Sequence, residues 1–130
     1  MRINFDSMTP IYVQVAGAIE DEIILGKLRE GEPAYSQIEL SRELRINPAT
    51  AAKGINLLAQ KGILEKQRGL SMTVAFGAKQ RILDEKREKE FSEIAGALVD
   101  QARKIGLPEE QVVKKIKALF AADERSVRHE

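Results

Sequence analysis

The segment from residue 46 to residue 61 predicts a helix with an unusually well-marked start. Asn47 can cap the helix with its side-chain carbonyl, and Pro48 suits the first helical position because its missing N–H would be unpaired there. Apolar residues then recur at steps of four and three, namely Ala51, Ile55 and Leu58. This spacing commits one face of the helix to a hydrophobic core.

The opposite face of this predicted helix is small or hydrogen-bonding, and it contains no acidic residue. Its members are Ala49, Thr50, Lys53, Asn56 and Gln60. A helix N-terminus attracts phosphate, and short polar side chains can reach the edges of bases. We therefore place the candidate function of the chain on this face, as a contact surface for nucleic acid.

The neighbouring segments predict a winged helix-turn-helix. Ser36 and Glu39 have the spacing of a capping box, and the short helix that they begin should bury Leu40 and Leu44 before a turn leads into the second helix. Gly62 ends that second helix, and two short strand-like runs at 63–67 and 72–76 then suggest a hairpin. The expected fold class is mainly α with a small β wing.

The size and composition of the chain limit its organisation. With 130 residues, of which 43% are hydrophobic, it can hold one small core and an appendage. We expect a DNA-binding domain at 1–77 and a helical dimerisation segment at 78–130. An apolar signal core and a membrane-length apolar run are both missing, so a cytoplasmic location without membrane attachment is expected.

Charge is distributed unevenly along the chain, although the net charge is only +1. Between residues 42 and 68 there are six basic residues against two acidic ones, Glu43 and Glu65. The basic residues are Arg42, Arg45, Lys53, Lys61, Lys66 and Arg68. This local excess favours a phosphate-binding surface on the second helix and the wing.

Catalytic and metal chemistry find little support in the sequence. His129 is the only histidine and lies in the C-terminal tail, and there is no cysteine. These facts leave no Cys-His pair, no thiolate metal site and no set of metal ligands around His129. We expect neither an enzyme nor a resident cofactor.

The segment after residue 77 predicts two amphipathic helices, which meet near Gly106 and Pro108. Large apolar residues form a stripe on each of them: Phe91, Ile94, Leu98, Ile105, Val112 and Ile116. Full burial of such a side chain stabilises a protein by roughly 1.5–3 kcal/mol, and two helices alone cannot cover both stripes. A second copy of the chain is the simplest partner, so a homodimer is expected.

Several of these features together resemble the GntR family of bacterial transcription regulators. They include the opening Pro10-Ile11-Tyr12-Val13-Gln14, the turn Gly26-Lys27-Leu28 and the helix start Asn47-Pro48-Ala49-Thr50. The opening and the helix start look most like the YtrA-like branch, whose members carry a short two-helix dimerisation segment. The resemblance implies a winged helix that reads the major groove as part of a homodimer.

The residue pattern and the resemblance together give the candidate DNA-binding residues. They are Ser36, Arg45, Asn47, Pro48, Ala49, Thr50, Lys53, Arg68 and Gly69. Arg68 and Gly69 match the Arg-Gly-x-Gly wing of similar proteins, whereas Ser71 replaces the second glycine. Ile38 stands where relatives have an arginine that contacts DNA.

Two functions follow from these observations. The first is a sequence-specific transcription regulator, expected to be a repressor, that binds a palindromic DNA operator as a homodimer. The second is a winged-helix interaction dimer with weakened DNA binding, which Ile38 and the nearly neutral charge suggest. A small-molecule effector is an open alternative for either function, because no side chain of the C-terminal segment specifies a ligand.

Overall fold

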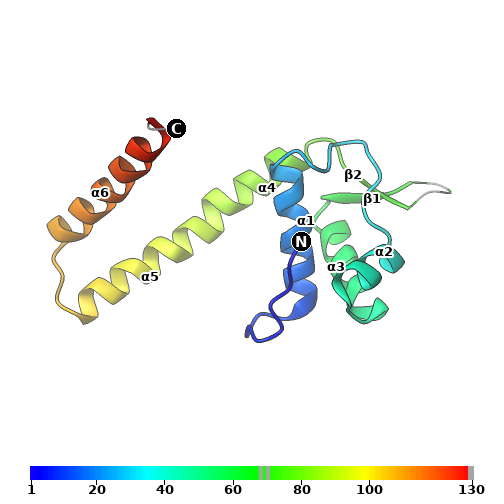
Figure 1. Cartoon of the computed structure of the whole chain (residues 1–130), viewed down its shortest axis with the longest axis horizontal. Coiled ribbons are helices and arrows are strands. Elements are labelled where there is room, and N and C mark those ends of the chain that lie inside the picture. The colour runs from blue at the N-terminus through cyan, green and yellow to red at the C-terminus, as the bar shows by residue number, and fades with distance from the viewer. Residues whose placement is uncertain (68, 70, 129–130) are drawn as a thin grey trace. The chain divides into compact units, whose positions relative to one another are not determined.

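The computed structural model describes residues 1–67, 69 and 71–128, and it divides the chain into two compact units, Met1–Lys86 and Arg87–Glu130. In the first unit the elements follow the order α1 (Ile11–Ile24), α2 (Gln37–Leu44), α3 (Pro48–Gln60), β1 (Leu64–Lys66), β2 (Met72–Val74) and α4 (Ala78–Glu85) (Figure 1). This order confirms the predicted fold class, a mainly α winged helix-turn-helix with a small β wing.

The core of the first unit forms where α1 packs against α3. Val15, Ile19 and Ile23 of α1 are buried together with Ile55 and Leu58 of α3. These residues have the four- and three-residue spacing that the sequence showed, so each helix buries one face and leaves the other exposed.

Gly54 allows the two helices to approach closely. A Cβ atom at this position would lie 2.8 Å from Cγ1 of Val15 and 3.0 Å from the backbone oxygen of Tyr12. Gly54 costs some helix propensity, but here it removes a steric barrier between α1 and α3. The closeness of the two helices at this point brings the start of α1 next to the exposed face of α3.

The wing is a two-stranded antiparallel sheet in which Leu64 pairs with Val74 and Lys66 pairs with Met72. Its strands are shorter than the runs expected from the sequence. The preceding segment also pairs with β2, because the N–H of Gly31 donates to the oxygen of Val74 at 2.7 Å and the N–H of Ala34 donates to the oxygen of Met72 at 2.8 Å. These bonds tie the turn after α1 to the base of the wing.

Helix α4 belongs to the first unit. Its residues Ala78 and Ile82 are buried in the same core as α1 and α3. A side-chain oxygen of Glu30 accepts a hydrogen bond from the backbone N–H of Gly77 at the start of this helix. The division between compact units therefore falls after Lys86, whereas the sequence suggested a boundary after residue 77.

The second unit consists of α5 (Phe91–Lys104) and α6 (Glu109–Arg128), joined through Gly106 at φ 74°. A π-helical turn, η1 (Lys86–Glu90), directly precedes α5 in the chain. The sequence suggested one long helix over this stretch. The structure instead places the wider π-helical turn between α4 and α5, where the two compact units divide.

Candidate nucleic-acid interface

The N-terminus of α3 is capped by a side chain and is exposed to solvent. The Oδ1 atom of Asn47 accepts a hydrogen bond from the N–H of Ala49 at 2.8 Å, and Pro48 occupies the first turn. The first turn contains no acidic residue, so the positive end of the helix dipole is not neutralised within the helix. The side chains of Asn47, Pro48 and Ala49 are all exposed.

The exposed face of α3 has the composition that the sequence predicted. Lys53, Asn56 and Gln60 are exposed, and Thr50 is half-buried. The residues on the other side, Ala51, Gly54, Ile55 and Leu58, are all buried. The face that we singled out is therefore available to a partner along the length of the helix.

The helix that precedes α3 begins with the predicted capping box. Oγ of Ser36 accepts a hydrogen bond from the N–H of Glu39 at 3.1 Å, and a carboxylate oxygen of Glu39 accepts one from the N–H of Ser36 at 3.4 Å. The Oγ atom and the backbone N–H of Ser36 thus both form hydrogen bonds that stabilise the start of α2. Ile38, at the second position of α2, has 61% of its surface exposed.

Arg45 lies in the turn between α2 and α3 and adopts a left-handed backbone conformation, with φ 54° and ψ 50°. Among the residues that the structure describes, Arg45 is the one non-glycine residue with a positive φ. Residues other than glycine, asparagine and aspartate seldom adopt this conformation. This local turn ends α2 and leaves the arginine side chain exposed beside the start of α3.

Tyr35, which directly precedes the capping residue of α2, links this segment to α1. The Tyr35 hydroxyl donates a hydrogen bond to Oε2 of Glu22 in α1 at 2.7 Å. This bond to the Glu22 carboxylate, aided by desolvation, raises the pKa of the Tyr35 phenol well above its usual range. The segment that enters α2 is therefore tied to α1.

The tip of the wing is described only in part. Gly69 is exposed and has a φ of 77°, a left-handed conformation that favours glycine. Arg68, which the sequence marked as the basic residue of the wing, lies outside the described residues. Lys66 and Gln67 are exposed at the end of β1.

Lys53 contacts a residue that sequence reasoning did not include among the candidates. Its Nζ atom lies 4.7 Å from the centroid of the Tyr12 ring, which is a cation–π distance. Tyr12 comes from the start of α1, and the close approach at Gly54 brings it there. The motif Pro-Ile-Tyr contained Tyr12, but only the packing of α1 on α3 pairs it with Lys53.

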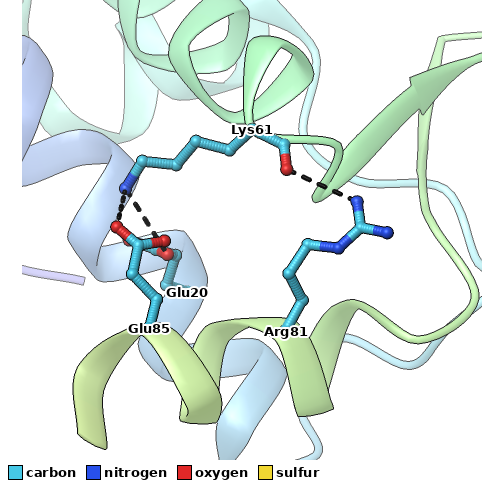
Figure 2. A network of polar contacts seen from close by, with 4 residues as sticks. All are labelled: Glu20, Lys61, Arg81 and Glu85. Atoms are coloured by element: carbon cyan, nitrogen blue, oxygen red, sulfur yellow. Dashed lines mark hydrogen bonds and ion pairs between the residues drawn. The ribbon is translucent and has the colours of Figure 1, made fainter. Parts of the chain in front are cut away.

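Lys61, at the C-terminal end of α3, is engaged elsewhere. Its Nζ atom lies 3.3 Å from Oε1 of Glu85 and 4.0 Å from Oε2 of Glu20. Nearby, Nη1 of Arg81 donates to the backbone oxygen of Lys61 at 3.4 Å (Figure 2). The same atom donates to the backbone oxygen of Gly62 at 3.0 Å. We call Glu20, Lys61, Arg81 and Glu85 the α3–α4 cluster; its contacts remove Lys61 from the basic surface that local charge counting suggested.

Other kinds of site are not supported by the described residues. No group of three or more His, Cys, Asp or Glu side chains in them is arranged to hold a metal ion. Among these residues, no helix combines the length and apolar character needed to cross a membrane. The capped face of α3 is the strongest candidate site.

Sequence and structure comparisons place the chain among helix-turn-helix regulators. No family model matches it. An uncharacterized helix-turn-helix transcriptional regulator of Bacillus subtilis (strain 168), YhcF, is 30% identical over 114 residues, which are 88% of this chain and 93% of the relative. The structure of YtrA from Sulfolobus acidocaldarius, a GntR-family transcription factor, is 30% identical over 75% of this chain and 96% of that one, with a TM-score of 0.60.

The chain belongs to the GntR family. A further relative is the transcriptional repressor YtrA of Bacillus subtilis (strain 168), which is 26% identical over 93% of this chain and 92% of its own length. The resemblance to the YtrA-like branch, first seen in the Pro-Ile-Tyr opening and the Asn-Pro start of α3, is thereby confirmed. As a GntR-family protein the chain is a DNA-binding transcription regulator and not an enzyme.

Within the GntR framework, the second unit contains a large apolar surface. A groove of about 500 Å³ lies between α5 and α6, lined mainly by leucine, isoleucine, valine and alanine side chains. The candidate dimerisation residues Phe91, Ile94, Leu98, Ile105 and Ile116 are exposed, and Val112 is half-buried. Phe91 and Ile94 each have 68% of their surface exposed, so α5 and α6 do not cover their own apolar stripes.

Proposed function

We propose that this GntR-family protein is a repressor that binds a palindromic DNA operator as a homodimer. The observation that carries the proposal is the exposed, acid-free face of α3, which begins at an Asn47 cap and lies beside a β hairpin. A helix of this kind can enter the major groove with its first residues facing base edges and phosphates. The similarity to a B. subtilis repressor supports the direction of regulation.

We assign different contacts to the parts of this surface. Thr50 and Lys53 on α3 face base edges or nearby phosphates, and the N-terminal turn with Asn47, Pro48 and Ala49 approaches the DNA backbone. Ser36 and Arg45 contact phosphate from α2 and the turn that follows it. Arg68 and Gly69 of the wing reach the backbone or the minor groove.

The homodimer accounts for the apolar stripes of α5 and α6. Phe91, Ile94 and Ile105 each have more than half of their surface exposed. Soluble proteins seldom leave such contiguous apolar surface uncovered. A second copy would bury these faces in a symmetric interface. The segment that carries α5 and α6 would thus provide dimerisation, and the protein would act in the cytoplasm, where the DNA is.

Selecting bound sequences from a random duplex pool with the full-length chain tests this proposal. We expect enrichment of one inverted repeat, with half-sites separated by about one helical turn or a multiple of it. Affinity should fall steeply as salt rises, because lysine and arginine contacts release counterions from phosphates. Recovery of unenriched sequences, bound equally weakly, would instead favour a winged-helix interaction dimer, the reading that exposed Ile38 supports.

A further inference from the structure

The α3–α4 cluster joins the C-terminal end of the recognition helix to the helix that leads out of the first unit. Its members come from α1, the end of α3 and α4, and all of them lie in the same compact unit (Figure 2). None of them is on the DNA-facing side that we assigned to α3. The cluster is therefore free to serve another purpose than DNA contact.

We propose that Arg81 and the Lys61–Glu85 pair are positioning residues that set the orientation of α4 on α3, and that they thereby determine which spacing between operator half-sites the dimer accepts. This proposal rests on the proposed function, since spacing has meaning only for a dimer on a two-part operator. It assigns a specificity role to residues that do not touch DNA.

The first step of the argument concerns what holds α4 in place. Ala78 and Ile82 attach the helix to the core through apolar contacts, which are strong but non-directional. Helix α4 also packs against α1, but apolar packing of this kind does not by itself fix one orientation of the helix. Hydrogen bonds depend on both distance and angle. The polar contacts of Arg81 and Glu85 therefore restrict movements of α4 that apolar packing alone would allow.

The second step concerns the geometry of these polar contacts. Arg81 reaches backbone oxygens just beyond the last turn of α3, where a helix has unpaired carbonyls and favours a cation. Glu85, one turn further along α4, reaches the side chain of the same residue, Lys61. At the start of α4, Glu30 accepts from Gly77. Polar contacts at the start, middle and end of α4 thus define one orientation.

The third step concerns Gly62, which makes room for the guanidinium group. A Cβ atom at this position would collide with Nη1 of Arg81, and the residue has a φ of 75°. The glycine ends α3 and at the same time opens the space through which Arg81 reaches the backbone. Lys61 and Gly62 therefore end α3 and also accept the hydrogen bonds from Arg81 of α4.

The last step links the cluster to dimerisation. Glu85 is the final residue of α4, and η1 and α5 follow it directly in the chain. The orientation of α4 therefore sets the point and direction at which the chain leaves the first unit. A π-helical turn at this point is a feature often found at functional sites.

The test uses full-length protein and a set of operators that differ only in the number of base pairs between half-sites. Arg81→Met removes the donors and keeps an unbranched side chain, and Arg81→Lys keeps the charge with a single donor group. Gln80→Ala is the matched control, because Gln80 is exposed and its side chain bonds Asp84 within the same helix. Wild type should prefer one spacing, and Arg81→Met should reduce that preference by about three- to thirtyfold.

Amide hydrogen exchange in the free protein provides a second measurement that does not depend on DNA. Arg81→Met should exchange faster than wild type in α4 and at the end of α3, whereas Gln80→Ala should match wild type. If Arg81→Met does not fold, Glu85→Gln, which keeps the shape and removes the charge, should show the same changes to a smaller extent.

The two measurements separate the possible outcomes. Faster exchange in α4 together with a weaker spacing preference supports the proposal, with partial recovery expected in Arg81→Lys. An unchanged spacing preference in Arg81→Met overturns it, whatever the exchange rates. If wild type prefers no operator at all, the proposed function fails, and unchanged exchange in α4 would then also remove the orienting role of Arg81.

Discussion

The ammonium group of Lys53 lies 4.7 Å from the centre of the Tyr12 ring, so a candidate DNA contact on α3 is held by a residue of α1. Lysine carries a long flexible side chain, and a ring beneath its charge restricts the positions that it occupies. Gly54, next to Lys53 in the chain, permits the helix approach that brings Tyr12 there. DNA contact and core packing thus meet at neighbouring residues of one helix.

Replacing Lys53 with Ala should weaken operator binding. The loss should be about 1–3 kcal/mol if Lys53 contacts a base edge, or a salt slope smaller by about one unit if it contacts a phosphate. Titration of the selected operator at several salt concentrations measures both quantities. Lys79→Ala, which removes an exposed lysine of α4, is the control and should bind like wild type. Unchanged binding by the Lys53 variant would remove this residue from the interface.

Replacing Tyr12 with Leu should affect DNA binding through Lys53. An exposed cation–π contact contributes roughly 0.5–1 kcal/mol, so the loss in operator affinity should be of that order. In a Lys53→Ala background the same change should have little further effect, which a double-mutant cycle measures. Tyr12→Phe keeps the ring and should retain most of the affinity. Equal losses with and without Lys53 would mean that Tyr12 acts independently.

The helix starts and the faces of α2 and α3 could be predicted from the sequence because their signals are local. Ser36 with Glu39, and Asn47 with Pro48, each act within four residues, and the burial of Leu58 follows from helical spacing. The pairing of Tyr12 with Lys53 could not be predicted in this way. Periodicity shows which face of a helix is buried, but it does not show which residue of another helix lies against it.

Charge counting along the chain was misleading at Lys61 for a related reason. The residue is close in sequence to the basic wing, but its ion-pair partner Glu85 is distant in sequence and lies on α4. The same helix explains the difference in domain boundary. The sequence grouped residues 78–85 with the helices that follow them, and only the packing of Ala78 and Ile82 shows that α4 completes the first core.

Gly54→Ala should destabilise the first unit. The added methyl group would meet Val15 and the backbone of Tyr12, and overpacking of this kind typically costs about 1–3 kcal/mol. Gly17→Ala on α1 is the matched control, because a Cβ atom there meets nothing within 4 Å. This control should raise the free energy of unfolding by roughly 0.5–1 kcal/mol, since alanine favours helix more than glycine does. Denaturant unfolding compares the two; equal effects would contradict the close crossing of α1 and α3.

The hydrogen bond from Tyr35 to Glu22 should make stability depend on alkaline pH. The pKa of Tyr35 is raised in the folded chain above its unfolded value of about 10, so the bond contributes fully below that pH. As the pH rises further, the unfolded state loses its proton first, and the contribution decreases until the folded pKa is passed.

Tyr35→Phe tests this contribution. Wild type should be more stable than the variant by about 1 kcal/mol near neutral pH, a value reduced by the partial exposure of the site. The difference should shrink above a pH of about 10. A constant difference between wild type and the Tyr35 variant would rule out the linkage.

Leu98→Arg tests the proposed dimer interface on α5. An arginine in the apolar stripe would place an unpaired charge in the interface, so sedimentation should show monomer in place of dimer. Leu98 has 43% of its surface exposed in the single chain, so helical content should be retained. Asp100→Arg on the same helix is the control and should remain dimeric. An unchanged dimer in the Leu98 variant would place the interface elsewhere.

Ile38 offers a test of how this chain departs from its family. The side chain is 61% exposed at the second position of α2, so an arginine fits there without disturbing the core. If the family contact has simply been lost, Ile38→Arg should bind non-specific duplex more tightly, with a salt slope steeper by about one phosphate. If isoleucine instead contacts a thymine methyl group, the variant should gain general affinity but lose discrimination at one base position.

Gln37→Arg separates these two explanations from a general effect of charge. It adds the same charge to the neighbouring exposed position of α2, but its side chain projects about 100° away around the helix. A gain in non-specific affinity confined to Ile38→Arg would place that position against the DNA backbone. Equal gains in both variants would reflect only the added charge near the interface. If neither variant changes affinity or salt slope, α2 does not approach DNA, and the contacts assigned to Ser36 would be wrong as well.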